Sequence, residues 1–535
     1  MKRLTITLFI LATLLLNMLP ACDGLDDHYS TNPTYRLSFS TDTLAFDTIF
    51  STIGSTTRQF MIYNKNSEPL SIESIMLASG EATGFRMNVD GRKGSSFNNV
   101  GILANDSMYV FVEVTVDPNG GNQPLLIQDS VLFTVNGIRQ SVLLEAYGQD
   151  VNLYKGGVTI TKDSILTANR PYLIYDSLVI AKGVSLNIEK GATFYMHDKA
   201  SLIVHGSMNA LGTLDEPITF RGDRLDYILN DILPYDRTPG QWGGITFKTD
   251  SYGNVWDNVI VRNGTSGVYC EPSTPDRPKI KINNSQITNM GSDLFFAINC
   301  DVIATNTEFS NAGGSVLTLV GGKYYFAHCT MANYMSLTKR EMASETVPLD
   351  SKCLYLLNNV TVDGNGPYPI TQAYFDNCTI DGSYDAELKA DGSTDFDYRF
   401  NHCALKAKES SSDHFKEVLF IKKTPSYRKV GGKQNKYTYD FRPDSVSTTG
   451  VGKADPEITK NSDRSLRCQP ANQFERPDHR CLRVCSGRDR RFKRIRIHYI
   501  LTINQSFNYE DFYVFSFILC LPSVICPSYV QGHDL

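Results

Sequence analysis

Apolar and polar residues alternate in short runs through the first 150 residues. The runs read YRLSFS, TLAFDTIF, RQFMIYN, LSIESIML, MYVFVEVTV, SVLFTVNG and RQSVLLEAYG. Alternation places successive side chains on opposite faces of a β-strand, and turn-forming segments such as VDGRKG and DPNGGN separate the runs. About seven strands within about 115 residues predict an Ig-like β-sandwich over residues 35–150. No chemistry is visible in this region, which favours a spacer or adhesion domain.

A different pattern begins at residue 151, where short β runs are joined by corners that contain glycine. Three stretches read YYFAHCTMAN (324–333), AYFDNCTIDG (373–382) and YRFNHCALKA (398–407), each with an aromatic residue, then Asn or His, then Cys. Most intervals between the Asn/His positions are about 22 to 26 residues, a period typical of one turn of a solenoid. The aligned residues are Asn258, Asn284, Asn306, His328, Asn359, Asn377 and His402.

Each turn of such a solenoid adds one strand to each of several parallel sheets, so equivalent residues stack about 4.8 Å apart. The Asn and His residues are therefore predicted to form a ladder at one corner, bonded to the next coil or to their own backbone. The residue that follows, which is Cys329, Cys378 or Cys403 in three coils, should pack inward. In this alignment the coil of Asn359 lies between Cys329 and Cys378.

Six cysteines fall within the predicted solenoid, and their spacing bears on three kinds of site. An even number of cysteines would allow disulfides if the chain is exported, with Cys378 and Cys403 as neighbours. One Cys per coil instead favours reduced cysteines that pack as small apolar residues. His328 and Cys329 are adjacent and point to opposite faces of a strand, as are His402 and Cys403, so neither pair suits a shared zinc ion. We expect no metal and no cofactor.

The segments SLNIEKGATFYM, VHGSMNALGTLDEPITFRGD and PGQWGGITF, with the repeated Asn/His-Cys strands, resemble the right-handed parallel β-helix family. The expected fold class is therefore all-β, with an N-terminal Ig-like β-sandwich followed by a right-handed parallel β-helix over residues 151–463. The family includes lyases, glycosidases, adhesins and proteins without known activity, so the fold alone implies no single function.

The catalytic motifs of the related pectin hydrolases are not found. Those enzymes carry an Asn-Thr-Asp motif, a paired Asp-Asp and a Gly-His-Gly. The nearest fragment to the first motif is Asn306-Thr307-Glu308, and the nearest to the second is Asp26-Asp27. No Gly-His-Gly occurs in the sequence. The densest acidic segment, DGSYDAELKADGSTDFDYR, lacks the calcium-loop pattern and is expected to be a solvated loop, with a weak cation or glycan site as the alternative. Its candidate ligands are Asp381, Asp385, Asp391 and Asp395.

Aromatic residues with polar neighbours occur in the segment RLDYILNDILPYDRTPGQW (224–242). They either cover the edge of a sheet or stack on sugar rings. The candidate glycan contacts are Tyr227, Tyr235 and Trp242.

The N-terminus has the form of a targeting segment, with MKR followed by the apolar stretch LTITLFILATLLLNML. Leu19-Pro20-Ala21-Cys22 resembles a bacterial lipobox, which implies a signal peptide over residues 1–21, lipid on Cys22 and a tether over residues 22–34. The acidic DGLDD that follows resembles the surface-export tag of Bacteroidetes lipoproteins. The resemblance implies a lipid anchor in the outer membrane and exposure to the cell exterior. The alternative is an ordinary secretory signal with a chance cysteine.

The composition changes after about residue 463. The segment RSLRCQPANQFERPDHRCLRVCSGRDRRFKRIRIHY is rich in Arg and Cys, and FYVFSFILCLPSVICPSYV imitates a membrane span. Read one base later, permissible codons for residues 464–486 can yield DRYGVSRLTSSSAPTIGAYEYVP, which resembles the closing coil of such lipoproteins. We therefore expect residues 464–535 to be an out-of-frame, disordered tail; the alternative is a basic patch followed by an anchor.

The charge balance narrows the class of partner. The net charge is −5 and charged residues make up 20% of the chain, so no basic excess points to nucleic acid. The first hypothesis is a non-catalytic surface lipoprotein whose β-helix binds polysaccharide or surface proteins. The alternatives are a β-helix polysaccharide lyase or glycoside hydrolase, and a purely structural surface component.

Overall fold

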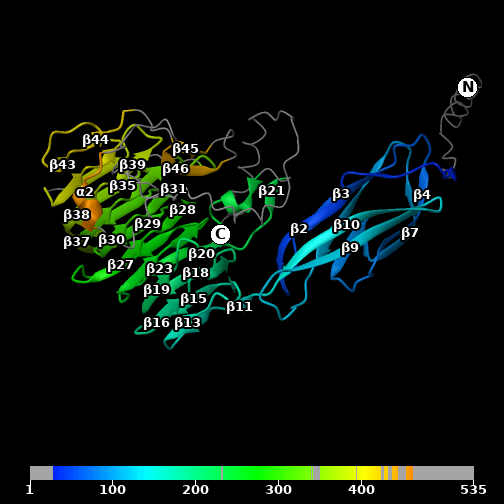
Figure 1. Ribbon diagram of the computed structural model, residues 1–535, viewed down its shortest axis with the longest axis horizontal. Coiled ribbons are helices and arrows are strands. Elements are labelled where there is room, and N and C mark those ends of the chain that lie inside the picture. The colour runs from blue at the N-terminus through cyan, green and yellow to red at the C-terminus, as the bar shows by residue number, and fades with distance from the viewer. Residues whose placement is uncertain are drawn as a thin grey trace, which may run out of the picture. The chain divides into compact units, whose positions relative to one another are not determined.

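The structure is a computed structural model that describes residues 28–229, 233–338, 340, 350–392, 395–422, 427–431, 437–443 and 453–461. The expected signal peptide, Cys22 and the tail over residues 464–535 lie outside the described residues. In the described part of the chain, no helix is long and apolar enough to cross a bilayer. The described elements are nearly all strands, which confirms the predicted fold class: an Ig-like β-sandwich and then a parallel β-helix (Figure 1).

The N-terminal sandwich consists of two five-stranded sheets. The first is ordered β1 (Ser38–Phe39), β3 (Arg58–Tyr63), β8 (Ser107–Val114), β5 (Phe85–Val89) and β6 (Arg92–Gly94). The second is ordered β2 (Thr43–Phe50), β10 (Ile138–Gln149), β9 (Leu125–Val135), β4 (Leu70–Leu77) and β7 (Ser96–Ile102). The alternating runs produce this arrangement because each strand buries one face: along β9 the side chains from Asp129 to Val135 are alternately buried and partly exposed.

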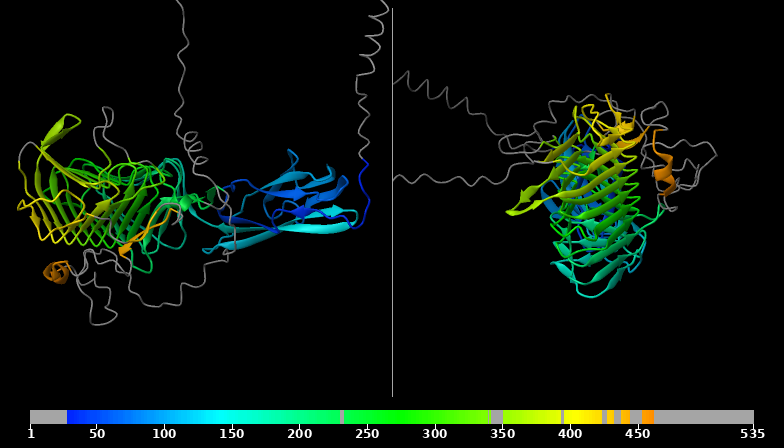
Figure 2. Two further views of the ribbon diagram at one scale, coloured as in Figure 1. Left: turned by 90° about the horizontal axis from the view of Figure 1, so that it is seen from above. Right: turned by 90° about the vertical axis from the view of Figure 1, so that its left-hand side faces the viewer.

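The solenoid winds through three parallel sheets, which we call sheets I, II and III (Figures 1 and 2). Sheet I contains β12 (Val158–Ile160), β15 (Ser177–Ile180), β18 (Ser201–Val204), β23 (Gly244–Phe247), β26 (Val268–Cys270), β29 (Phe295–Ile298), β32 (Leu317–Val320), β35 (Leu354–Asn358) and β40 (Leu388–Gly392). Sheet II contains β13 (Ser164–Leu166), β16 (Ser185–Ile188), β19 (Ser207–Leu211), β24 (Asn254–Asp257), β27 (Pro278–Asn283), β30 (Asp301–Thr305), β33 (Gly322–Ala327), β38 (Ile370–Asp376), β41 (Tyr398–Asn401) and β43 (Phe415–Lys416). Sheet III contains β11 (Asn152–Tyr154), β14 (Tyr172–Ile174), β17 (Thr193–Met196), β20 (Ile218–Gly222), β25 (Val259–Arg262), β28 (Gln286–Met290), β31 (Glu308–Ala312), β34 (Thr330–Asn333), β39 (Thr379–Gly382), β42 (Ala404–Leu405) and β44 (Leu419–Phe420).

Smaller elements are inserted between the coils or follow them. They are β21 (Tyr227–Leu229), β22 (Leu233–Pro234), the 3-10 turn η1 (Tyr235–Arg237), β36 (Val360–Val362), β37 (Asn365–Tyr368), β45 (Tyr427–Val430), β46 (Tyr439–Pro443) and α2 (Pro456–Asn461).

Identical side chains stack in the solenoid core because consecutive coils stay in register. Phe326, Phe375 and Phe400 are direct register partners, and their ring centroids lie 5.2 and 4.9 Å apart. Offset stacking of this kind stabilises each pair by about 0.5–1.5 kcal/mol beyond the burial of apolar area.

The Asn and His residues of the predicted ladder all adopt left-handed backbone conformations, with φ between 48° and 55°. Asn and His enter this region more readily than most residues, and the corner between sheets II and III requires it. Hydrogen bonds join successive corners: Asn306 Nδ2 donates to Asn284 Oδ1 at 2.6 Å, and Asn284 Nδ2 donates to Asp257 Oδ1 at 2.8 Å.

Asn359 was predicted to belong to this ladder, and that prediction is wrong. Ala327 pairs with Asp376, so His328 and Asn377 occupy the same corner of adjacent coils. Asn359 instead follows β35 of sheet I and starts the β36–β37 hairpin, where its backbone N–H donates to the carbonyl of Tyr368 at 2.9 Å. The insertion divides one coil into two intervals that imitate two coils.

The same register corrects the order of the cysteines. Thr330 pairs with Thr379, so Cys329 and Cys378 lie on adjacent coils without another coil between them. Cys329, Cys378 and Cys403 form a continuous inner row, and each is fully buried. All six described cysteines are free thiols, so the alternative Cys378–Cys403 bridge is not formed. Burial raises the pKa of the Cys378 thiol well above its ordinary value, which keeps it protonated and unreactive.

Candidate functional site

The outer face of sheet I carries two adjacent aromatic side chains. Tyr269 on β26 pairs in register with Phe296 on β29, and their ring centroids lie 5.5 Å apart. Both rings are partly buried and point away from the solenoid core. We call Tyr269 and Phe296 the aromatic strip. Because both residues lie on paired strands, the backbone fixes their separation.

A hairpin packs against one end of this strip. Strands β36 and β37 contribute Val360, Val362 and Tyr368 to an apolar cluster that is separate from the solenoid core. The cluster also contains the buried Tyr355, which occupies the same register row as Phe296 two coils further along. The hairpin thus lies against the later coils of sheet I, and the aromatic strip packs against the same apolar cluster.

The hairpin approaches sheet I very closely at one glycine. Gly321 has a φ of 54°, and a Cβ added there would meet the Cβ of Tyr368 at 2.4 Å. Any larger residue at this position would push the hairpin away from the sheet. Glycine is therefore needed for both its backbone conformation and its lack of a side chain.

Charged groups border the aromatic strip. Lys248 and Glu271 form an ion pair on the sheet I side, and Asp363 lies at the turn of the hairpin. Burial raises the pKa of the Tyr269 hydroxyl, and the nearby carboxylates of Glu271 and Asp363 raise it further. The phenol therefore stays protonated and can donate a hydrogen bond at neutral pH.

This arrangement combines an apolar surface with hydrogen-bonding groups at its rim. Two aromatic rings can contact the apolar face of a sugar, while the carboxylates and the lysine can bond its hydroxyl groups. Among the described residues, no group of three or more His, Cys, Asp or Glu side chains could hold a metal ion.

The three aromatic residues predicted from sequence are placed differently from one another. Trp242 is fully buried in the core, and its indole N–H donates to the backbone carbonyl of Arg262 at 2.9 Å. Its prediction as a glycan contact is wrong. Tyr227 is 40% exposed on β21, and Tyr235 lies under the guanidinium of Arg224 at 4.1 Å from its ring centroid. These two residues remain candidate contacts.

The predicted cation loop does not assemble, and its first residue shows why. Asp381 is fully buried on β39, where its Oδ2 accepts hydrogen bonds from the hydroxyls of Tyr334 at 2.8 Å and Tyr427 at 3.0 Å. Burial raises the pKa of its carboxyl, although these hydrogen bonds act in the opposite direction. Asp381 therefore holds the β45–β46 region against sheet III and does not face solvent.

The other three acidic residues lie apart from Asp381. Asp391 pairs with Lys389 at 3.2 Å on β40, and Asp395 contacts His414 at 3.2 Å. Asp385 is exposed in the turn between β39 and β40. The acidic segment thus crosses from sheet III to sheet I, and its carboxylates are distributed over separate surfaces.

The sequence interpretation missed the aromatic strip. Tyr269 stands in GVYCEP, which lacks the Asn/His-Cys pattern, and Phe296 stands in DLFFAINC, whose Asn299-Cys300 pair was not among the residues aligned as the ladder. Their neighbours Val268, Cys270 and Ala297 are buried, so alternation within each strand would have assigned both rings to the outer face.

Comparison with known proteins gives no family. No family model and no curated protein matches the chain. Among solved structures, the catalytic domain of Agl-KA has a TM-score of 0.24 at 10% identity, over 66% of this chain and 76% of that chain. A family 123 glycoside hydrolase from Clostridium perfringens has a TM-score of 0.16 at 8% identity, and a protein of unknown function from Porphyromonas gingivalis W83 has 0.17 at 12%. These two similarities cover 23% and 24% of this chain, and 30% and 60% of the other chains. Similarities this low carry no functional argument.

Proposed function

We propose that this chain is an exported, lipid-anchored protein whose β-helix presents a glycan-binding face outside the cell. The observation that carries the proposal is the aromatic strip on the outer face of sheet I, bordered by carboxylates and a lysine. Anchoring through Cys22 rests on the resemblance of its N-terminal segment to Bacteroidetes surface lipoproteins. The lipid would then attach the protein to the outer membrane. Its binding partner would be a polysaccharide or a surface protein that carries a polysaccharide.

The glycan proposal is tested by binding of the full-length protein to an oligosaccharide array, followed by titration of the glycans that bind. Removing both rings with Tyr269→Ala and Phe296→Ala should weaken binding by about tenfold or more, because aromatic anchors carry most of the affinity at such contacts. Tyr374→Ala is the matched control, since Tyr374 also faces outward from a solenoid strand but belongs to sheet II. Equal affinity of the double variant and the wild type would contradict the proposal.

The hairpin provides an independent variant. Gly321→Ala displaces Tyr368 without altering either ring, so it should weaken binding while the fold of the solenoid is kept. A depolymerisation assay on the same glycans separates binding from catalysis. Release of shortened products would favour the alternative of a polysaccharide lyase or glycoside hydrolase, with Glu271 and Asp363 as the carboxylates to replace first.

Anchoring is tested by Cys22→Ser. Lipid attachment requires the thiol, so this variant should lose an incorporated fatty-acid label and leave the membrane fraction. A wild-type protein that takes up no label would show that the segment is an ordinary secretory signal.

A further inference from the structure

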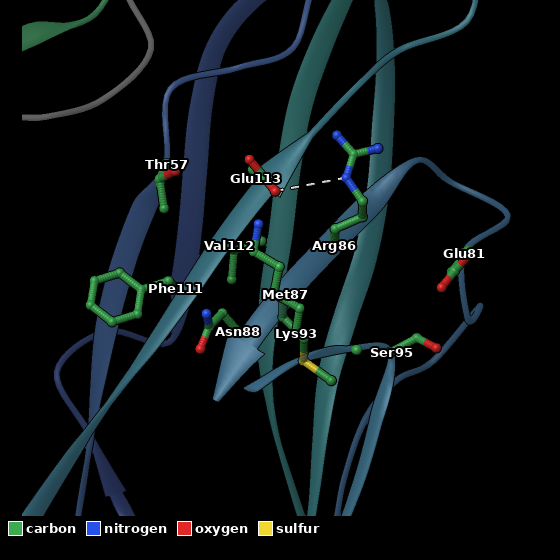
Figure 3. Close-up of a pocket in the computed structure, with 11 residues that line it drawn as sticks. Thr57, Glu81, Arg86, Met87, Asn88, Lys93, Ser95, Phe111, Val112 and Glu113 are labelled. Carbon is green, nitrogen blue, oxygen red and sulfur yellow. Dashed lines mark ion pairs between the residues drawn. The ribbon is translucent and has the colours of Figure 1, made fainter. Parts of the chain in front are cut away.

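The sandwich has a surface pocket of its own, on the outer face of its first sheet. It has a volume of about 430 Å³, within the range of small-ligand sites. Its floor is made by outward-facing residues of β8, β5 and β6 (Figure 3). Phe111 on β8 pairs with Asn88 on β5, which in turn pairs with Lys93 on β6. In the next register row, Glu113 pairs with Arg86.

An exposed aromatic surface continues from this pocket along β8. Phe111 is 36% exposed and Tyr109 is 46% exposed, and their rings lie 5.8 Å apart with an interplanar angle of 28°. A soluble sheet face normally carries polar residues at such positions, so two adjacent large rings indicate a contact surface. The two rings together form an apolar platform beside the pocket.

One pocket atom lacks a hydrogen-bond partner. Oδ1 of Asn88 is buried, and among the described residues nothing donates a hydrogen bond to it. Leaving such an acceptor unsatisfied costs about 1–3 kcal/mol, and a rotation of the Asn88 side chain that exposes Oδ1 to a ligand hydroxyl would remove that cost. Asn88 is the direct cross-strand neighbour of Phe111, so the unsatisfied atom lies beside the aromatic platform.

The charges of the pocket select against an ionic ligand. Arg86 and Lys93 are balanced by Glu81 and Glu113, and Arg86 Nε lies 3.8 Å from Glu113 Oε1. Neither a phosphate nor a polyanionic glycan would find a net positive site. The pocket combines hydrogen-bond donors and acceptors with an apolar platform, which suits a neutral ring with hydroxyl groups at its edge.

We infer that the outer face of the sandwich binds a neutral sugar ring, stacked on Phe111 and Tyr109 and hydrogen-bonded to Asn88. This site is separate from the aromatic strip of the solenoid and does not depend on it. The sandwich is then a second binding module as well as a spacer.

Saturation-transfer NMR on the full-length protein tests the inference, with neutral gluco-, manno- and galacto-oligosaccharides as probes. Sulfated and uronic-acid oligosaccharides of the same length form the comparison set. The full-length variant carrying both Tyr269→Ala and Phe296→Ala supplies the background, so that signal from the solenoid is removed. We expect transfer to ring protons of a neutral sugar, and a loss of affinity of about tenfold in Phe111→Ala and in Asn88→Ala.

Leu126→Ala is the matched control, because Leu126 is 42% exposed on the other sheet of the sandwich. Phe111→Tyr, which keeps the ring, should retain binding and so separates loss of contact from loss of fold. The inference is overturned if no neutral sugar receives transfer, if only the charged sugars do, or if Phe111→Ala binds as tightly as the control. Transfer to a neutral sugar that is retained in the solenoid variant supports this site whether or not the same variant loses binding on the glycan array.

Discussion

The left-handed corner at Asn306 predicts that a glycine variant is more stable than an alanine variant, the reverse of the usual order. Asn306 has a φ of 48° and donates a 2.6 Å hydrogen bond to Asn284. Alanine in this conformation costs about 1–2 kcal/mol, and the lost hydrogen bond costs about 1 kcal/mol more. Asn306→Ala should therefore lower the free energy of unfolding by about 2–3 kcal/mol. Asn306→Gly loses the hydrogen bond and some chain entropy but fits the backbone, so it should cost about 1–2 kcal/mol.

A matched pair at Asn209 should show the opposite order. Asn209 lies within the extended strand β19 and donates a similar side-chain hydrogen bond to Asn187 at 3.0 Å. In a strand interior, glycine is less stable than alanine by about 0.5–1 kcal/mol. Asn209→Gly should therefore be less stable than Asn209→Ala, although the same amide is removed in both.

Urea unfolding followed by tryptophan fluorescence measures these differences in the solenoid alone. The chain has two tryptophans, Trp242 and Trp256, and both are fully buried in the solenoid core. Solenoids can unfold in parts, so the comparison requires equal m-values in all four variants. Equal or greater stability of Asn306→Ala relative to Asn306→Gly would refute the backbone argument for the ladder.

Three further predictions concern buried polar groups. Burial lowers the pKa of His328, so below about pH 6.5 the unfolded chain binds a proton that the folded chain does not. The free energy of unfolding should therefore fall as the pH drops. His328→Asn should reduce this acid sensitivity in urea titrations from pH 7.5 to 5. Arg340 and Glu387 form a buried ion pair at 2.8 Å, so Glu387→Gln should cost about 3–5 kcal/mol, and adding Arg340→Met should restore part of the loss in thermal unfolding. Cys403 should react with a thiol reagent only after unfolding, as peptide mapping would show.

The sequence was informative where the fold restricts the residue type. Left-handed corners select Asn or His at a fixed spacing, so Asn258, Asn284 and Asn306 could be aligned without a structure. Asn359 was placed wrongly because it has the same conformation for a local reason: it starts a hairpin. The spacing rule detects left-handed corners in general and does not distinguish one corner of a coil from another.

The candidate site was less predictable because outer rows carry no such restriction. Tyr269 and Phe296 become neighbours only when the register between β26 and β29 is known, and the intervening sequence does not fix that register. The prediction of Trp242 as a glycan contact failed for a related reason. It looked like an exposed aromatic residue in a loop, whereas it opens the coil that leads into β23 and fills the core there.

The two proposed sites share a physical basis that explains why a β chain can acquire them. Inner rows such as Phe326 and Phe375 are constrained by close packing, so a change there costs stability. Outer rows are set in register by the same backbone but lie outside the close-packed core. Two aromatic residues on paired strands, or two residues apart on one strand, therefore acquire a fixed separation at little cost to the fold, as in Tyr269 with Phe296 and Phe111 with Tyr109. A preorganised aromatic surface loses little entropy on binding, and so the outer faces of both domains are the places where binding can arise by substitution alone.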